Sequence, residues 1–231
     1  MKTAFVYSTD ENYVKLTAVS IHSLLKHNPE ASIVILVNDI SDGSASFLQK
    51  LVSDRGGSLE LIDVKSRLLK IRELGAGSYV SFSAYSRLFI PALLIGRFER
   101  AIYIDGDTLI ASSLASLTDL DLHGKAFAIG FDCIHNAYKK LIGLPPDAPY
   151  FNSGVLLMDL DQWLQSRCSE RVFDYMKNVR HDLMFGDQDY FSLVLADAAA
   201  LLPPQYNFLT HFQIFRSAAD ARYIMDTPAV C

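Results

Sequence analysis

The chain has 231 residues, of which 50% are hydrophobic and 20% charged, and its formal net charge is −5. This composition excludes a disordered chain, and the length suits one domain around one sizeable core. Lysine and arginine are scattered along the chain. We therefore expect no nucleic-acid partner and no strong electrostatic attraction to anionic lipid.

The sequence predicts no transmembrane segment, because the apolar run at 88–96 is too short to span a bilayer. Asp10, Glu11 and Lys15 interrupt the region where a secretory signal would have its apolar core. The three cysteines are far apart and show no metal-ligand spacing. A reducing cytoplasm is therefore the expected location.

Short apolar runs, typical of strands, alternate with longer runs whose apolar residues recur with the spacing of a helix. This alternation predicts an α/β fold with a parallel or mixed sheet covered by helices on both faces. In chain order we expect a strand at 4–7, a helix at 13–26, a strand at 32–37, a helix at 42–54, strands at 58–62 and 100–104 with a helix at 83–94 between them, strands at 126–130 and 155–159 with a loop at 138–150 between them, helices at 161–178 and 187–197, and a strand at 221–231.

Two carboxylates follow an apolar strand directly. Asp105 and Asp107 come after the expected strand at 100–104 and are separated by Gly106. Ligands of open α/β sheets bind beyond the carboxyl ends of the strands. A turn loosened by the glycine can point both carboxylates at one hard cation, Mn²⁺ or Mg²⁺, which can bridge a diphosphate. The alternative is an acidic turn that only ends the strand, since Asp-x-Asp is frequent by chance.

The loop after the first expected strand, Ser8 to Tyr13, is polar and lies at the same edge of the predicted sheet. Asp10 or Asn12 could hydrogen-bond a nucleobase or ribose, and Tyr13 could stack on a base. An equally strong interpretation is that Thr9, Asp10 or Asn12 only caps the helix that follows.

Two more segments carry polar residues next to expected elements. A turn containing Asn152, Ser153 and a glycine precedes the strand at 155–159, and Asn152 could hydrogen-bond a ligand there. Asp187 and Gln188 begin the last expected helix. Asp187 is a plausible helix cap, but the same geometry could present a carboxylate and Gln188 to a sugar.

One arginine lies on the helix expected at 83–94. Arg87 could bind a diphosphate through two parallel hydrogen bonds. The alternative is a surface arginine or one in an ion pair.

In their order along the chain, these segments resemble glycosyltransferase family 8, which includes glycogenin and bacterial lipopolysaccharide galactosyl- and glucosyltransferases. The likeness spans Ala4 to about Phe208. It rests on six motifs: Ser8 to Tyr13, Tyr85 to Leu88, Tyr103 to Asp107, Phe151 to Leu160, Asp187 to Asp189, and Leu202 to Asn207.

The resemblance implies a GT-A (Rossmann-like) fold for a single catalytic domain at 1–231, a Mn²⁺-dependent UDP-hexose site, and retention of anomeric configuration. It implies that Asp105 and Asp107 hold the metal and that Asp187 and Gln188 position the sugar for catalysis. The residues implied to contact the nucleotide sugar are Ser8, Asp10, Asn12, Tyr13, Arg87, Asp105, Gly106, Asp107, Asn152, Ser153, Asp187 and Gln188.

The sequence departs from the family in one respect. Members usually supply a third metal ligand from a histidine, followed by a glycine and a Lys-Pro-Trp sequence that close over the diphosphate. We find no such segment, and it would be expected just after residues 227–231. The domain is therefore expected to lack the closing segment.

The expected reaction is transfer of a hexose from UDP-glucose or UDP-galactose to an acceptor hydroxyl of a glycan or a lipid-linked sugar. The family suggests lipopolysaccharide or surface-glycan synthesis, with peripheral association at the inner face of the membrane. A noncatalytic nucleotide-sugar-binding module is the main alternative. A sugar nucleotidyltransferase ranks lower, because the loop at 8–12 has no glycine, lysine or arginine to hold phosphates.

Overall fold

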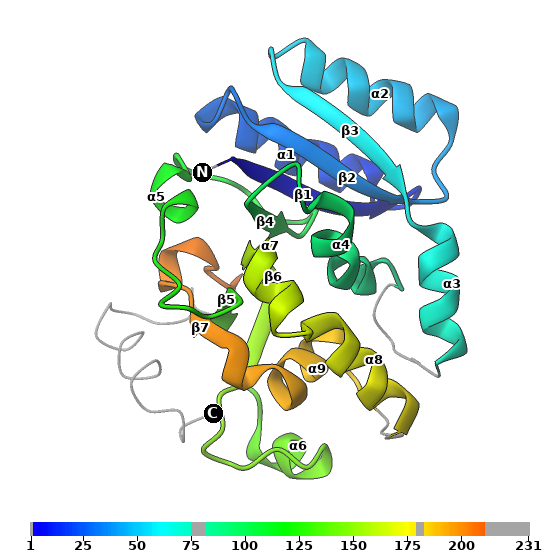
Figure 1. Ribbon diagram of the computed structural model, residues 1–231. Helices are drawn as coiled ribbons and strands as arrows, with labels where there is room; N and C mark the ends of the chain where they lie inside the picture. The colour runs from blue at the N-terminus through cyan, green and yellow to red at the C-terminus, as the bar shows by residue number, and fades with distance from the viewer. Residues whose placement is uncertain (1, 75–81, 179–182, 211–231) are drawn as a thin grey trace.

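The computed structural model describes residues 2–74, 82–178 and 183–210, which form a seven-stranded sheet in the order β3-β2-β1-β4-β6-β5-β7 (Figure 1). β6 is antiparallel to both of its neighbours, whereas every other neighbouring pair is parallel. The predicted α/β class and the mostly parallel mixed sheet are confirmed. The strands are β1 (Thr3–Asp10), β2 (Ser32–Asn38), β3 (Ser58–Asp63), β4 (Arg100–Ile104), β5 (Phe127–Phe131), β6 (Phe151–Asp159) and β7 (Ala199–Leu201).

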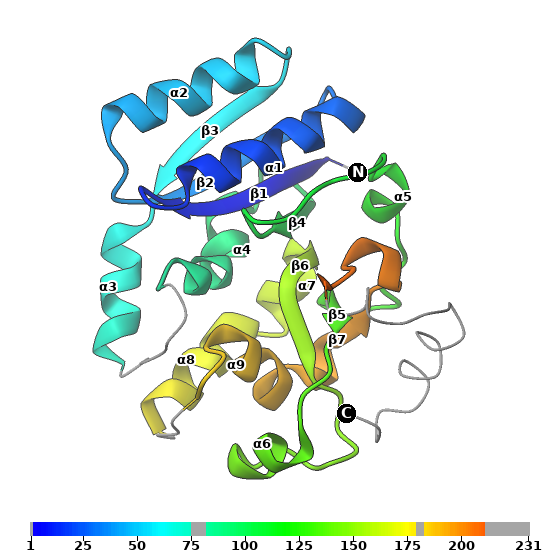
Figure 2. The ribbon, with the colours of Figure 1, turned by 180° about the vertical axis from the view of Figure 1, so that it is seen from behind.

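Helices cover both faces of the sheet, as Figures 1 and 2 show from opposite sides. α1 (Val14–His27), α2 (Asp42–Ser53) and α5 (Ala115–Thr118) pack on one face, and α3 (Lys65–Glu73), α4 (Ile90–Leu94), α7 (Leu160–Gln165), α8 (Cys168–Asn178) and α9 (Asp187–Val194) pack on the other. Successive side chains of a strand point to opposite faces. In β1, Phe5 and Tyr7 therefore join the core under α1, and Ala4 and Val6 join the opposite core.

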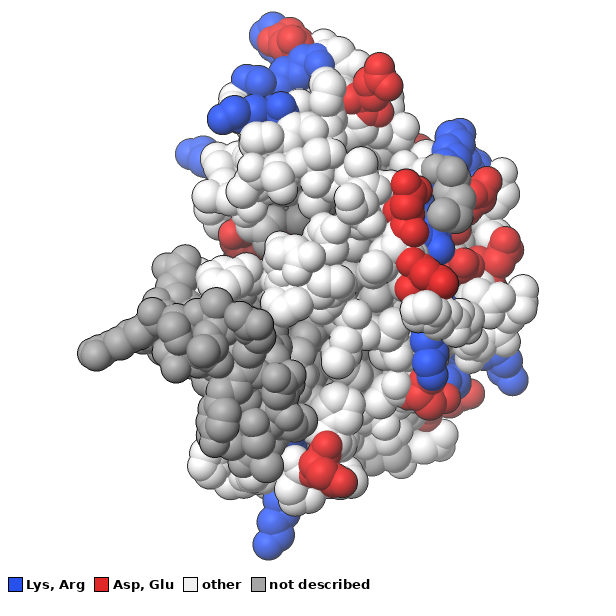
Figure 3. Space-filling model, turned by 90° about the vertical axis from the view of Figure 1, so that its left-hand side faces the viewer, with Lys and Arg blue, Asp and Glu red and all other residues white. Residues whose placement is uncertain are grey.

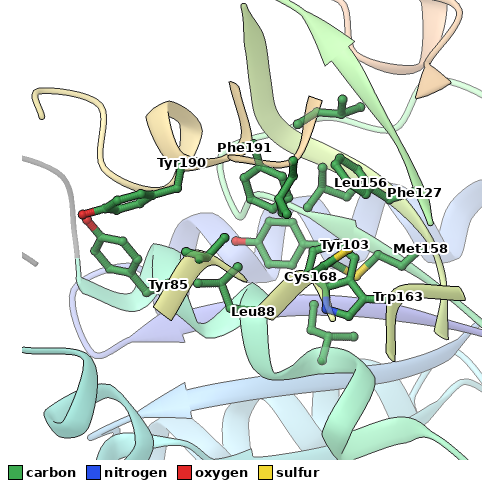
Figure 4. Close-up of a cluster of buried hydrophobic side chains, with 14 of the residues drawn as sticks. Tyr85, Leu88, Tyr103, Phe127, Leu156, Met158, Trp163, Cys168, Tyr190 and Phe191 are labelled. Atoms are coloured by element: carbon green, nitrogen blue, oxygen red, sulfur yellow. The ribbon is translucent and has the colours of Figure 1, made fainter. Parts of the chain in front are cut away.

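Aromatic side chains hold the C-terminal helices against the sheet (Figure 4). The ring centroid of Phe127 in β5 lies 5.3 Å from that of Trp163 in α7 and 5.4 Å from that of Phe191 in α9. All three side chains are fully buried. Large-to-small changes at such rings typically cost about 3–5 kcal/mol, so this packing contributes substantially to holding α7 and α9 on the sheet.

Two predicted helices are each divided into two segments in the structure. The helix predicted at 83–94 is a 3₁₀ segment, η1 (Phe82–Phe89), followed by α4. Pro91 lies in the first turn of α4, where its missing N–H costs nothing, so it helps to begin a helix instead of disturbing one. The helix predicted at 161–178 is broken into α7 and α8 near Arg167, whose φ is +52°.

The predicted turn at 151–154 is wrong, because β6 already begins at Phe151. The loop predicted at 138–150 overlaps α6 (Asn136–Leu141), which the sequence did not predict, and α3 and β7 were also not predicted. The helix predicted at 187–197 ends at Val194. The strand predicted at 221–231 lies outside the described residues.

No helix within the described ranges is long and apolar enough to cross a membrane. On the face shown in Figure 3, lysine and arginine side chains lie in separate groups, with acidic side chains between several of them.

The chain leaving β4 packs directly on α1. Thr108 Oγ1 lies 3.1 Å from Ser20 Oγ on that helix. At Gly106 the contact is so close that an added Cβ would lie 2.5 Å from Thr17 Oγ1 and 3.3 Å from Thr17 Cα. A glycine is therefore required between Asp105 and Asp107 because of the neighbouring helix.

We predict that Gly106→Ala lowers the free energy of unfolding by about 1–3 kcal/mol, because the methyl group overpacks this contact. Urea unfolding measures the change, and Gly43→Ala, where an added Cβ meets only Ser41 Oγ at 3.9 Å, is the matched control. In a Thr17→Ala background the cost of Gly106→Ala should fall. An equal cost in both backgrounds would contradict the proposed clash.

Candidate active site

A cleft of about 340 Å³ opens at the carboxyl ends of β1 and β4. β2 and β4 lie on opposite sides of β1, so the cleft lies where the strand order reverses, the usual ligand position in such sheets. Its volume is at the lower end of the range for small-molecule sites. Its lining is formed by Ser8, Thr9, Asp10, Tyr13, Ser83, Ala84, Arg87, Tyr103, Asp105, Gly106, Asp107, Ser153, Phe185, Asp187 and Gln188.

Most of the predicted site residues meet in this cleft. Asn12 and Asn152 are the two that do not line it. The residues come from the end of β1, which runs to Asp10 and not only to the predicted Tyr7, from the turn that follows it, from η1, from the turn after β4, from β6 and from the start of α9. Segments up to about 180 residues apart in sequence therefore share one cavity, as the strand-end argument predicted.

The buried side chain of Arg87, 3% exposed, joins the walls of the cleft. Its Nη2 donates to Asp105 Oδ1 at 3.1 Å, its Nη1 to the backbone oxygen of Ser153, and its Nε to that of Ala84 at 2.8 Å. Asp187 Oδ2 lies 3.0 Å from the same Nε. Because that N–H points to Ala84, Asp187 is held mainly by charge and not by a well-aligned hydrogen bond with the guanidinium.

Asp105 is fixed from two sides. Its Oδ1 also accepts a hydrogen bond from the Tyr103 hydroxyl at 2.8 Å, and the Arg87 guanidinium lies 4.3 Å from the centre of the Tyr103 ring. Burial raises the pKa of Asp105, while Arg87 and the Tyr103 hydroxyl oppose the rise. The negative charge of Asp107 adds to the rise in the pKa of Asp105.

Asp107 differs from Asp105 in its exposure and in its contacts. It is exposed at the cleft, and among the described residues it makes no hydrogen bond and no ion pair. Both of its oxygens are therefore available to a ligand. Carboxylate oxygens are donors that suit hard cations such as Mg²⁺ and Mn²⁺.

Asp187 is 2% exposed at the first turn of α9. The structure corrects the prediction that it caps this helix, because the cap residue is Gly186. Burial raises the pKa of the Asp187 carboxyl to about 6, and the positive charge of Arg87 only partly opposes this shift.

The sequence argument missed Asp132, which joins two predicted residues. Its Oδ2 accepts from Asn152 Nδ2 at 3.2 Å and from Gln188 Nε2 at 3.1 Å. Asn152 Oδ1 in turn accepts from Asn207 Nδ2 at 3.0 Å. Asn152 therefore supports Gln188 from behind the cleft. The signal was present in the sequence, since Asp132 follows the apolar strand β5 as Asp105 follows β4.

The loop after β1 is held by its own acidic residues. Asp10 Oδ1 accepts from the backbone N–H groups of Asn12 and Tyr13 at 3.0 and 3.2 Å. The Glu11 carboxylate accepts from the Ser41 N–H at 2.8 Å and from the Ser44 hydroxyl at 2.8 Å, which ties the loop to the start of α2. Tyr13 is 42% exposed and is the residue immediately before α1.

Residues 4–230, almost the whole chain, match the family described as glycosyl transferase family 8. The chain belongs to this family. It is 26% identical to the lipopolysaccharide 1,2-glucosyltransferase of Escherichia coli K12, over 87% of this chain and 60% of that protein. It is 23% identical to the glycosyltransferase GlyF of Streptococcus pneumoniae serotype 4, over 99% of this chain and 54% of that protein. The family 8 chain thus spans little more than half the length of these relatives.

Solved structures agree on the fold. The galactosyltransferase LgtC, in complex with donor and acceptor sugar analogues, superposes with a TM-score of 0.76 at 24% identity, covering 99% of this chain and 84% of that one. Mouse xyloside xylosyltransferase 1 gives a TM-score of 0.69 at 16% identity, covering 100% of this chain and 94% of that one. The predicted GT-A fold of this family 8 member is confirmed.

We predict a pH-dependent effect of Asp187→Asn on stability. Below pH 3.8, the ordinary pKa of an aspartate, the Asp187 carboxyl is protonated in both the folded and the unfolded chain. As the pH rises, it loses its proton near pH 4 in the unfolded chain and only near pH 6 in the folded chain, because burial raises its pKa to about 6. Wild type should therefore lose stability relative to the variant as pH rises from about 4 to 7, by roughly 2–3 kcal/mol. Urea unfolding in EDTA at several pH values measures this difference, with the exposed Asp119→Asn as the control. A difference between wild type and Asp187→Asn that stays constant with pH would contradict the shift.

Proposed function

We propose that this family 8 chain transfers a hexose from UDP-glucose or UDP-galactose to an acceptor hydroxyl, with retention of anomeric configuration. The observation that carries the proposal is that Asp105, Asp107, Arg87, Asp187 and Gln188 line one cleft at the carboxyl ends of the strands. The family supports a glycosyl transfer, and the similarity to lipopolysaccharide 1,2-glucosyltransferases supports a hexose donor.

A divalent cation, Mn²⁺ or Mg²⁺, fits the charge of the cleft. Among the described residues, four carboxylates (Asp10, Asp105, Asp107, Asp187) and one guanidinium, that of Arg87, line it. Such an excess of negative charge would repel a diphosphate, and a cation held by Asp105 and Asp107 would offset it. When bound, it would neutralise the charge of the UDP leaving group. No group of three metal-ligating side chains exists within the described ranges, so Asp105 and Asp107 are the two protein ligands that we assign to the cation.

The remaining residues divide between the two ends of the donor. We assign the nucleotide end to Ser8 and Asp10 at the end of β1 and to Asn12 and Tyr13 in the turn that follows, where Tyr13 offers an exposed ring for stacking. Asn12 is not part of the cleft lining, so its contact would require the bound nucleotide to extend beyond the cleft.

The hexose end is assigned to Asp187 and Gln188, together with Ser153 of β6. Asn152, also in β6, lies behind the cleft lining and would act through Asp132, which accepts from Gln188. Asp187 lies against Arg87 and Gln188 donates to Asp132, so both side chains are held by the protein before any ligand arrives. Neither is a free carboxylate placed for attack. We therefore favour a same-face displacement, in which the leaving-group oxygen assists deprotonation of the acceptor, over a covalent two-carboxylate scheme.

The acceptor is proposed to be a glycan or a lipid-linked sugar in lipopolysaccharide or surface-glycan synthesis. The basis is the similarity to lipopolysaccharide 1,2-glucosyltransferases of Escherichia coli. A cytoplasmic location, at the inner face of the membrane, follows from this role, and no nucleic acid is expected as a partner.

We predict that Asp107→Asn abolishes the Mn²⁺-dependent part of UDP-hexose binding, because Asp107 has no other partner to preserve. Asp105→Asn should do the same and also destabilise the protein, since it weakens the contact with Arg87. Thermal unfolding with UDP-glucose or UDP-galactose, with and without Mn²⁺, measures binding, because ligand at about 100 times Kd stabilises by roughly 2.7 kcal/mol.

Asp119→Asn, at an exposed acid outside the cleft, is the control and should bind like wild type. Unchanged Mn²⁺-dependent affinity in Asp107→Asn would overturn the metal assignment. Tight binding of both donors by wild type, without release of UDP in the presence of candidate acceptors, would favour the noncatalytic binding module.

A further inference from the structure

The third acid of the Asp187-Gln188-Asp189 motif faces away from the cleft. Asp189 is fully buried and is not part of the cleft lining. Its Oδ1 accepts from the Tyr150 hydroxyl at 2.5 Å, and its Oδ2 accepts from the Tyr138 hydroxyl at 2.7 Å and from the Phe185 N–H at 2.9 Å. Asp189 could reach a sugar in the cleft only by breaking these bonds.

The same two tyrosines hold the residues just before α9. The Tyr138 hydroxyl accepts from the Met184 N–H at 2.8 Å while donating to Asp189. The Phe185 ring packs edge-on against Tyr138, with ring centroids 5.2 Å apart, and against Tyr150 at 6.5 Å. Phe185 itself lines the cleft beside Asp187 and Gln188. Contacts made behind the cleft therefore fix one of its walls.

The turn before α9 depends on this arrangement because its cap is a glycine. Gly186 has a φ of +56° and no side chain to accept a backbone N–H. In a capping box, an acid in the first turn reaches back to a backbone N–H before the helix. Asp189 does this with Phe185, and the Met184 N–H is bound by Tyr138. Burial raises the pKa of both phenols, so they remain protonated donors.

We propose that Asp189, Tyr138 and Tyr150, the Asp189 cluster, position Phe185, Asp187 and Gln188 to hold the hexose of the donor. The inference rests on the proposed UDP-hexose site. Tyr138 belongs to α6 and Tyr150 precedes β6, so the segment between β5 and β6 is tied to the sugar end of the cleft. Displacement of positioning groups by about 1 Å can cost 10²-fold in rate. Asp189 is thus a positioning residue and not a catalytic one.

The test compares affinities for UDP and for UDP-hexose by titration calorimetry with Mn²⁺. Asp189→Ala should weaken UDP-glucose or UDP-galactose binding by about tenfold or more, because the first turn of α9 loses its anchor. UDP affinity should change little, since the nucleotide end lies at β1. A role limited to stability would lower the melting temperature and leave the ratio of the two affinities unchanged, which would overturn the proposal.

Asp189→Asn is the rescue variant. Its amide oxygen can accept from Tyr138 and Phe185, and its amide group can donate to Tyr150, so both affinities and UDP release from the donor should stay close to wild type. If Asp189 were a catalytic carboxylate, the Asp189→Asn variant would bind the donor but would be as inactive as Asp189→Ala. That outcome would also overturn the proposal.

Two conservative variants keep the rings and the fold. Tyr138→Phe removes the bonds to Asp189 and Met184, whereas Tyr150→Phe removes the bond to Asp189. Tyr138→Phe should therefore weaken UDP-hexose binding more than Tyr150→Phe, with UDP binding unchanged in both. If both variants and Asp189→Ala bind UDP-hexose as tightly as wild type, the positioning role of the Asp189 cluster is wrong and the proposed function stands. Absence of any UDP affinity in wild type would defeat the proposed function as well.

Discussion

The site depends on one buried positive charge. Placing a guanidinium in the interior costs several kcal/mol unless charges and hydrogen bonds compensate it. Arg87 receives that compensation from the Asp105 and Asp187 carboxylates and from the backbone oxygens of Ala84 and Ser153. These groups belong to η1, to the end of β4, to β6 and to α9. The charge of Arg87 is compensated only when all four elements are packed together. The interaction that orders the cleft therefore forms only once the sheet and its helices have assembled.

The single positive charge of Arg87 leaves the cleft with an excess of negative charge. Arg87 donates to Asp105 Oδ1 and lies beside the Asp187 carboxylate, whereas Asp107 makes no hydrogen bond or ion pair among the described residues. One guanidinium cannot offset the carboxylates around it, and burial already raises the pKa of Asp105 and Asp187. The remaining negative charge is therefore concentrated beside Asp107, at the open side of the site. A site with this charge attracts cations and repels anions.

Sequence patterns predicted the parts of the site that follow from strand ends. The strand at 100–104 was predicted with its observed bounds, so Asp105 and Asp107 were placed at the correct edge of the sheet. Asp132 carries the same signal but was overlooked, and Asn152 was placed in a turn although it lies in β6, because its polar neighbours mask a strand whose pairing with β5 shifts register there. β7 has three residues and depends on pairing with β5, which no local pattern reveals. Tertiary contacts decided the last two features, the start of β6 and the existence of β7.

The Asp187-Gln188-Asp189 motif shows that recognising a motif in the sequence does not tell which of its residues faces the cleft. Consecutive residues of a helix point about 100° apart, so three in a row cannot share one face. Asp187 and Gln188 face the cleft, and Asp189 necessarily turns toward Tyr138 and Tyr150. The sequence shows two acids of the same type two positions apart. Only the packing around α9 distinguishes them. Asp187 lies next to Arg87 at the cleft, whereas both oxygens of Asp189 accept hydrogen bonds from within the protein. The fold thus places one carboxylate of the motif at the cleft and uses the other to hold the backbone of Phe185 in the cleft wall.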